Sequence, residues 1–461
     1  MKPLIFLTLI LLPSCTLGPD FSLPNFNPGK TFKQPTSTRA TRIPDAWWTL
    51  FKDPELNRLT QKAISANNDL AAARARRDTA RALIGADRTR LFPRLDLNSS
   101  NGISRLSADN NFPGIPLQNQ NYRTTLNLSY DADLWGANRR RLEAANARAN
   151  AAEQLLDSQR LGIATEVARQ YFILRALDQQ ETILQETIAS RNQALVIQTS
   201  REKVGTSDSL AATRAQAEVE LAENDLTNVQ RQRGTAANAL AIICGTTPAE
   251  FKISPKNSPS TLPNISAGLP AEVLARRPDV RAAEQNLRAA SAHIGIAEAA
   301  FYPNLSLTGS AGLESLTTRN FLDWQSRVAS LGAGLTAPIL EAGANKANYE
   351  ASRSNYQEAL ASYRQTLLTA IREVQDALVD LQSLSRSRKN LEAAEQSAQK
   401  NLRVSQSRYQ QGITSYLEVV DSERFVLSRR LALAELHGQQ KVSLAALIQA
   451  LGGSWNSKNP A

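Results

Sequence analysis

Residues that usually build catalytic and metal centres are scarce in this sequence of 461 residues, which has two cysteines, two histidines and one methionine. His293 and His437 lie far apart and lack the close spacing of metal-ligand motifs. Because Cys15 is assigned below to an export signal, Cys244 has no partner for a disulfide framework. The sequence also lacks a nucleotide-binding loop and a nucleophile spaced from a base. We therefore expect no enzyme, no metal and no cofactor.

Proline is absent from two long stretches, between Pro116 and Pro248 and between Pro338 and Pro460, and glycine is rare within them. Proline breaks helices and glycine weakens them, so nothing in these stretches interrupts a helix. A helix over residues 137–203 would be ~100 Å long at the helical rise of about 1.5 Å per residue. Such a length exceeds what a globular domain needs.

Long basic runs are also missing, although the formal net charge is +10. The lysines and arginines alternate with acidic residues along the predicted helices, and only short runs such as Arg139-Arg140-Arg141 occur. A mixed-charge helix surface explains this pattern better than a nucleic-acid partner does.

The sequence contains an internal duplication. Adding 207 to the residue number aligns Gly136, Gly205 and Gly245 with Gly343, Gly412 and Gly452, and apolar positions spaced by three, four and seven coincide as well. In each copy a short break, at 204–208 and at 411–415, contains a glycine followed by Ser, Thr or Asp. These residues are typical of a helix end followed by a new N-cap. Each copy is predicted to contain a very long helical hairpin with a tight tip.

The N-terminus reads as an export signal. A charged start and a short apolar run over residues 1–14 are typical of a signal peptide, and the ending Leu12-Pro13-Ser14-Cys15 resembles a bacterial lipobox. We expect Cys15 to be acylated and residues 15–53 to form a lipidated tether. We interpret Trp47 and Trp48 as packing anchors and expect one helix from about residue 54 to Leu91.

Two segments, at about 93–135 and 303–340, change to a period of two. Leu126, Leu128 and Tyr130 alternate with polar residues, and the second segment repeats this pattern, so each segment is predicted to be a β-hairpin. Four strands cannot close a barrel, and open edges in lipid are costly, so a dimer or a trimer is required if the strands lie in a membrane. A soluble four-stranded sheet is the alternative.

The predicted organisation is therefore a first repeat at 54–245, a Pro/Ser-rich linker at 246–269, a second repeat at 270–453 and a C-terminal tail at 454–461. The fold class is mainly α with a β portion, built from duplicated long helical hairpins.

Several motifs taken together resemble the outer membrane efflux protein family, the TolC-like channels, and within it the lipoprotein branch that serves RND-type pumps. These motifs are Gly18-Pro19-Asp20, Trp47-Trp48 through Phe51 and Asp53-Pro54, Leu274 through Arg276-Arg277-Pro278-Asp279, and Arg408-Tyr409 through Gly412, Tyr416-Leu417 and Asp421. The resemblance covers the chain from Cys15 to about Gly453.

The resemblance implies a homotrimer with a twelve-stranded β-barrel in the bacterial outer membrane and a twelve-helix α-barrel tunnel through the periplasm. It implies a lipid-anchored chain in contact with outer-membrane lipid, a periplasmic adaptor (membrane fusion) protein and an inner-membrane RND-type pump. The adaptor-contact tips would be Val204, Gly205, Thr206, Gly412, Ile413 and Thr414.

The resemblance also implies a gate. Glu418 and Asp421 match acidic rings at the narrowest point of family channels, and such rings favour cations over anions. Tyr409 matches a tyrosine of the family's closing network. Thr414 stands where well-known members carry an arginine, and a threonine cannot make that residue's bidentate bonds.

The function that this implies is a passive exit duct for drugs and other small compounds, within a tripartite, multidrug-type efflux system. A type I-like protein or peptide secretion channel is a second transport hypothesis. A basic coiled-coil scaffold inside the cell is an alternative from a different class.

Overall fold

The computed structural model describes residues 16–34, 41, 43–107, 109, 117–206, 208–256 and 262–453. The predicted signal peptide, Cys15 and the tail at 454–461 lie outside the described residues. The chain divides into two compact units. The first unit comprises residues 1–25, 76–153 and 282–364, and the second comprises 26–75, 154–281 and 365–461.

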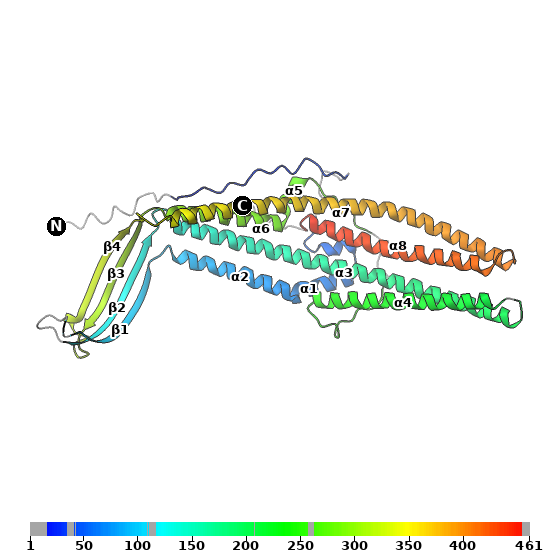
Figure 1. Cartoon of the computed structure of the whole chain (residues 1–461), viewed down its shortest axis with the longest axis horizontal. Coiled ribbons are helices and arrows are strands. Elements are labelled where there is room, and N and C mark those ends of the chain that lie inside the picture. Colours follow the sequence, from blue (N-terminus) through cyan, green and yellow to red (C-terminus); the bar gives the residue numbers. More distant parts are fainter. Residues whose placement is uncertain are drawn as a thin grey trace. The chain divides into compact units, whose positions relative to one another are not determined.

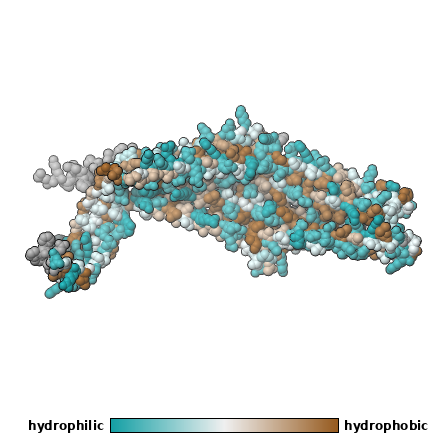
Figure 2. All heavy atoms as spheres, in the orientation of Figure 1, coloured by the Kyte–Doolittle hydropathy of each residue, from teal (hydrophilic) through white to brown (hydrophobic). Residues whose placement is uncertain are grey.

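Two pairs of helices dominate the chain (Figure 1). Helices α3 (Ala137–Lys203) and α7 (Ala344–Gln410) each have 67 residues, and α4 (Ser209–Ile243) and α8 (Tyr416–Ala450) each have 35. Corresponding helices start 207 residues apart, at 137 and 344 and at 209 and 416, which is the repeat offset of the sequence. The predicted long hairpins and their duplication are confirmed. Figure 2 shows hydrophilic residues spread over the helical surface, with apolar residues between them.

Glycine makes the two hairpin tips possible. Gly205 has φ +74° and Gly412 has φ +73°, a left-handed conformation that side chains disfavour. After each glycine the backbone closes the helix end: Thr206 N donates to Arg201 O at 2.9 Å, and Ile413 N donates to Arg408 O at 2.9 Å. The Asp208 carboxylate then caps α4 by accepting from Ala211 N at 3.2 Å.

The single helix expected from residue 54 to Leu91 was wrong. The structure has α1 (Pro54–Ala66) and α2 (Asn68–Thr89), separated by Asn67 in an extended conformation. The Asn67 side chain accepts from Leu70 N at 3.1 Å and donates to Ile243 O at 2.9 Å, so it replaces helical backbone bonds. The second copy has the same break between α5 (Pro270–Arg276) and α6 (Pro278–Ala299), where Pro278 disfavours a helical residue before it.

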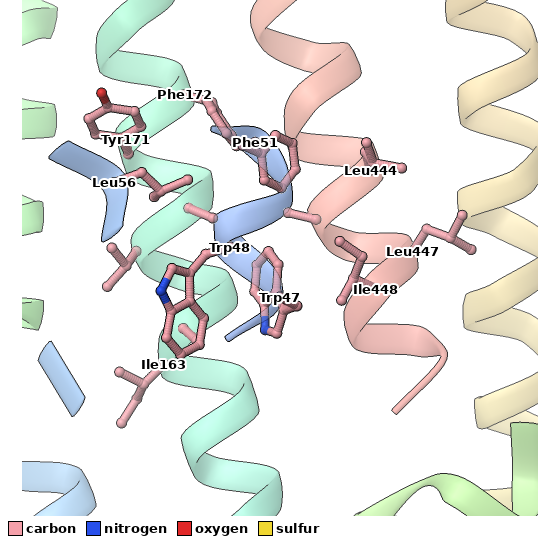
Figure 3. Packing of buried hydrophobic residues seen from close by; sticks show 14 of the residues in the cluster. Trp47, Trp48, Phe51, Leu56, Ile163, Tyr171, Phe172, Leu444, Leu447 and Ile448 are labelled. Carbon is pink, nitrogen blue, oxygen red and sulfur yellow. The ribbon is translucent and has the colours of Figure 1, made fainter. Parts of the chain in front are cut away.

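The main core of the second unit surrounds a short 3-10 helix, η2 (Trp47–Phe51). Trp47 is 1% exposed, and its ring lies edge-on to Trp48 at 6.0 Å (Figure 3). Residues of α3 and α8 surround this group, among them Phe172, Leu444, Leu447 and Ile448 (Figure 3). Burying a large side chain stabilises a fold by about 1.5–3 kcal/mol. The packing interpretation of the paired tryptophans is confirmed.

The first unit contains one antiparallel sheet in the order β1-β2-β3-β4 (Figure 1). Its strands are β1 (Arg94–Arg105), β2 (Gln118–Ala132), β3 (Asn304–Ser315) and β4 (Arg327–Thr336). A second 3-10 turn, η4 (Trp324–Ser326), precedes β4. The strands β1 and β4 are the edges of the sheet, and among the described residues neither edge pairs with a further strand on its outer side.

One face of this sheet is apolar and uncovered. Leu95 pairs with Leu128, Leu97 with Leu126, and Leu305 with Leu335, so leucines from all four strands share that face. All of these leucines except the partly buried Leu305 are exposed in the single chain. The opposite face carries hydroxyl and amide side chains such as Asn127, Ser306 and Thr308. An apolar face of this kind needs a partner, either a bilayer or another protein layer. Within the described residues, no helix carries an apolar stretch that could cross a bilayer.

Candidate functional site

The predicted gate residues lie on the first turns of α8, next to the second hairpin tip. Glu418 and Asp421 are both exposed, whereas Val419 and Val420 between them are buried. Residues three apart share a helix face, so the two carboxylates point to the same side. The structure therefore brings the two acids together on an open surface.

Tyr409 links the two hairpins. Its hydroxyl accepts a hydrogen bond from Arg201 Nη1 at 2.9 Å and donates one to Gln198 Oε1 at 2.9 Å, both on α3. The Arg201 guanidinium also lies over the Tyr409 ring, 5.3 Å from its centroid. The ring of Tyr416 is 5.6 Å away on the other side of the tip. Sequence reasoning found Tyr409 but missed Arg201 and Gln198, because no local pattern marks them.

A second link joins the hairpins through a buried carboxylate. Glu218 on α4 is 4% exposed and pairs with Arg191 on α3, Nη2 to Oε2, at 2.9 Å. Arg191 Nη1 also donates to the Glu218 carbonyl at 2.6 Å. From α8, Arg424 Nε donates to Glu218 Oε1 at 2.8 Å. One acid thus holds two arginines from different hairpins. No local pattern in the sequence distinguishes these three residues from the other charged residues of the helices.

Burial and charge shift the pKa of several groups here. The hydrogen bond to Glu218 raises the pKa of Arg424, so the guanidinium stays charged. Burial raises the pKa of Tyr416 to about 12. Burial, together with the nearby Glu218 carboxylate, also raises the pKa of Glu423, although Arg191 opposes the shift. Burial near the second hairpin tip therefore disfavours the negatively charged forms of Tyr416 and Glu423.

Arg424 also moderates the acidic face. Its Nη1 lies 4.0 Å from Asp421 Oδ1, and the two side chains are 53% and 63% exposed. A cation one turn beyond the acids reduces the negative potential that Asp421 alone would create.

The remaining tip residues are surface groups. Val204 is 73% exposed and Ile413 is 61% exposed, while Gly205, Thr206 and Gly412 are exposed backbone turns. Thr414 is half-buried, and its hydroxyl has no hydrogen-bond partner among the described residues. Thr414 therefore forms no link between helices in this structure.

The thiol of Cys244 and the imidazole of His293, which the sequence raised as possible ligands, have buried or partly buried surroundings. Cys244 is buried, its Sγ lies 3.6 Å from Leu59 O, and burial raises the pKa of its thiol to about 11. His293 contacts Arg148 at 2.6 Å, and burial lowers the pKa of its imidazole. No group of three or more metal-ligating side chains occurs in the described part of the chain.

Comparison with known proteins places this geometry in a family. The model of the outer membrane efflux protein family matches residues 59–246 and 269–453. The solvent efflux pump outer membrane protein SrpC of Pseudomonas putida is 32% identical over 467 residues, covering 99% of this chain and 98% of SrpC. The cation efflux system protein CusC of Escherichia coli is 30% identical over 462 residues, covering 98% of this chain and 99% of CusC.

A solved structure agrees with these relatives. The CmeC outer membrane channel of Campylobacter jejuni superimposes with a TM-score of 0.91 at 26% identity, over 97% of this chain and 96% of CmeC. Both copies of the duplicated hairpin, the sheet and the tips fall within the matched length. The chain belongs to the outer membrane efflux protein family.

Proposed function

We propose that this protein is the outer-membrane channel of a tripartite efflux system, a passive duct for small compounds that an inner-membrane pump delivers through a periplasmic adaptor. One observation carries the proposal: a single chain combines a sheet with an uncovered apolar face and two duplicated helical hairpins whose long arms are about 100 Å in length. A membrane-embedded sheet that continues into a long helical tunnel needs no chemistry of its own.

The open edges of the sheet support assembly from three chains. In lipid, each unpaired backbone group costs several kcal/mol, so β1 and β4 need partners. Pairing β4 of one chain with β1 of the next keeps every neighbour antiparallel. Three chains then supply twelve strands, enough for a barrel with an open lumen.

The inner-membrane pump selects the compounds that the duct exports. The relatives are named for different compounds: SrpC for solvent efflux and CusC for cation efflux. We propose drugs and other small amphipathic compounds, with a type I-like protein secretion role as the alternative. The test uses cells that lack their own channel and receive this chain together with its pump and adaptor. Restored export of a dye by these cells would support efflux. Restored protein secretion alone would support the alternative.

We assign the gate to the acidic face of α8. In a trimer, Glu418 and Asp421 would form two rings around the axis, with Arg424 close behind them. The field of these rings favours cations at the narrow end of the duct. The exposure of both acids on one helix face supports this assignment.

The gate is held by contacts between the hairpins. Tyr409 with Arg201 and Gln198, and Glu218 with Arg424, fasten the second hairpin to the first near the tips. These bonds take the place of an arginine at Thr414. Opening the duct requires the α7–α8 hairpin to leave the α3–α4 hairpin, so these bonds, together with the pair of Arg430 and Glu186 at 2.8 Å, stabilise the closed state.

The exposed tips are the proposed adaptor contacts. Val204 and Ile413 offer apolar side chains beside the exposed residues Gly205, Thr206 and Gly412, and the half-buried Thr414 follows Ile413. Exposed apolar groups at a turn are suited to docking another protein.

We also propose that Cys15 is acylated and anchors the chain to the outer membrane. Just after this cysteine, Leu17 N donates to Trp135 O at 3.1 Å, and the buried Arg140 donates to Leu17 O at 3.0 Å and to Asp20 at 2.9 Å. The start of the tether is thus fixed beside the end of β2, where the strands leave the membrane. Acyl chains on Cys15 would enter the inner leaflet at that level.

The test of the proposal is the native mass of protein extracted from outer membranes, followed by the mass of the denatured chain. A trimer whose chains begin at an acylated Cys15 is expected. A soluble, unacylated monomer would contradict the channel assignment and favour the cytoplasmic scaffold.

A further inference from the structure

The outer end of the sheet carries a cationic and aromatic group that conduction and gating do not require. Helices precede β1 and β3 and follow β2 and β4 at one end of the sheet. Leu106, which follows β1, Leu117, which precedes β2, and segment 316–326 therefore lie at the opposite end. The proposed function, on which this inference rests for orientation, places that opposite end at the outer surface of the membrane.

Strand register puts Arg327 on the lipid-facing side. In the β3–β4 ladder Arg327 pairs with Leu313, and further along the ladder Gly309 pairs with Leu331. Side chains alternate between faces, so Arg327 shares a face with Leu331 and Leu335. Arg327 is the first residue of β4, so it lies at the outer end of that apolar face, and it is exposed.

An indole holds the Arg327 side chain in place. The guanidinium carbon lies 3.7 Å from the centroid of the Trp324 ring, and Trp324 is 75% exposed. Two neighbouring residues of the same segment, Leu316 and Leu322, are also exposed. Tryptophan with exposed leucines at the end of a strand is typical of the interface between bilayer and water.

The segment before β4 is ordered by its own hydrogen bonds. Ser326 Oγ donates to Asn320 O at 2.6 Å, and Asp323 N donates to the same carbonyl at 3.0 Å. Trp324 is therefore presented by a folded turn, η4, that fixes its position relative to the start of β4.

Charges are sorted between the two faces of the sheet. On the hydroxyl-bearing face, Arg123 of β2 pairs with Glu314 of β3 at 3.7 Å. On the apolar face, Arg327 makes no ion pair within the described part of the chain. An arginine at the edge of a lipid-facing surface favours an anionic headgroup, because the planar guanidinium binds phosphate through two parallel N–H bonds.

We propose that Arg327 and Trp324 form a binding site for a phosphate group of an outer-leaflet glycolipid such as lipid A. The guanidinium lies over the indole, and its N–H groups would bind the phosphate, while Leu322 and Trp324 would contact the lipid beside the headgroup. The apolar face of the sheet continues directly from this site, so the acyl chains have a surface to follow. Each chain would supply one such site.

The test uses the purified channel in detergent. The channel is titrated with bis-phosphorylated lipid A and, separately, with the same lipid after removal of both phosphates. Native mass spectrometry counts the lipids that are bound. The wild-type protein should prefer the phosphorylated lipid. Arg327→Gln should bind it roughly fivefold more weakly, the factor expected for one arginine near an anionic lipid surface. Arg327→Lys should lose less than Arg327→Gln, because it keeps the charge.

The matched control is Arg123→Gln, which removes an arginine from the opposite face of the same sheet. Its lipid preference should equal that of the wild type. The inference would be overturned if the wild type bound both lipids equally, or if Arg123→Gln and Arg327→Gln had equal effects. Displacement of the lipid by an equimolar amount of inorganic phosphate would also overturn it. Conductance of Arg327→Gln in phosphatidylcholine bilayers separates this result from a failure of the channel itself.

Discussion

Arg424 on α8 donates to the carboxylate of Glu218 on α4, and this bond joins the second helical hairpin to the first at the level of the proposed gate. Glu218 is buried and also pairs with Arg191, so it keeps an ion-pair partner when Arg424 leaves. Arg424 is half-exposed and can leave without stranding a buried, unpaired charge. The pair is suited to a contact that breaks when the duct opens, whereas Arg191 and Glu218 keep α3 and α4 together.

Arg424→Gln combined with Tyr409→Phe should favour the open duct. The two changes remove the bonds that Arg424 of α8 and Tyr409 of α7 make to the first hairpin, and they leave the pair of Arg430 with Glu186 in place. We expect a loss of about 1–2 kcal/mol in total, or roughly a tenfold shift in the ratio of open to closed channels. Single-channel conductance in planar bilayers measures this shift. Arg169→Gln, which removes a pair with Glu166 within α3, is the control and should leave conductance unchanged. Wild-type conductance in the double variant would contradict the role of these bonds.

Glu418→Ala with Asp421→Ala should raise the conductance of anions relative to cations, because the variant removes both proposed carboxylate rings and leaves Arg424 near the axis. Reversal potentials in a salt gradient report the change. Glu435→Ala, on the same helix but far from the tip, serves as the matched control. An unchanged ion preference in the double variant would remove the acidic rings from the gate.

The sequence was enough to predict the architecture, because its information is periodic. The repeat offset of 207 and the alternation around Leu126 are patterns of residue type along the chain. Gly205 and Gly412 mark positions where the backbone needs a left-handed conformation. Such features can be read without knowledge of tertiary contacts. The family resemblance was enough to identify Glu418, Asp421 and Tyr409 as candidates.

Contacts between helices were not predictable in the same way. Arg201, Glu218 and Arg424 are separated by up to about 220 positions in the chain and are ordinary charged residues on mixed-charge helices. Nothing local distinguishes Arg424 from its solvated neighbours. The break at Asn67 was missed for a related reason: an asparagine inside a helical pattern ends the helix only when its side chain finds distant partners, here including Ile243 O.

Asn67→Ala should destabilise the junction between α1 and α2. Alanine removes the bond that caps α2 at Leu70 and leaves Ile243 O without its donor, at a cost of about 1–2 kcal/mol in the free energy of unfolding. Thermal unfolding followed by circular dichroism measures the loss. Asn68→Ala, the exposed neighbour, should be nearly neutral and is the control. If both variants unfold at the wild-type temperature, the Asn67 bonds do not stabilise the junction.

Lys441 on α8 should make stability depend on pH in alkaline solution. Burial lowers the pKa of its ammonium to about 8 in the folded chain, although the Asp53 carboxylate opposes the shift, and the ordinary lysine pKa lies near 10.4. The unfolded chain therefore binds more protons than the folded chain between about pH 8 and pH 10.4. Over that window the contribution of Lys441 to the free energy of unfolding rises with pH, and below it the penalty of the buried charge is fully present.

Lys441→Met, which keeps the length of the side chain beside Phe172, should remove this dependence and raise the unfolding temperature near neutral pH. Lys400→Met, an exposed lysine on α7, is the control. Parallel curves of unfolding temperature against pH for the wild type and Lys441→Met would show that the ammonium of Lys441 titrates as it does in water.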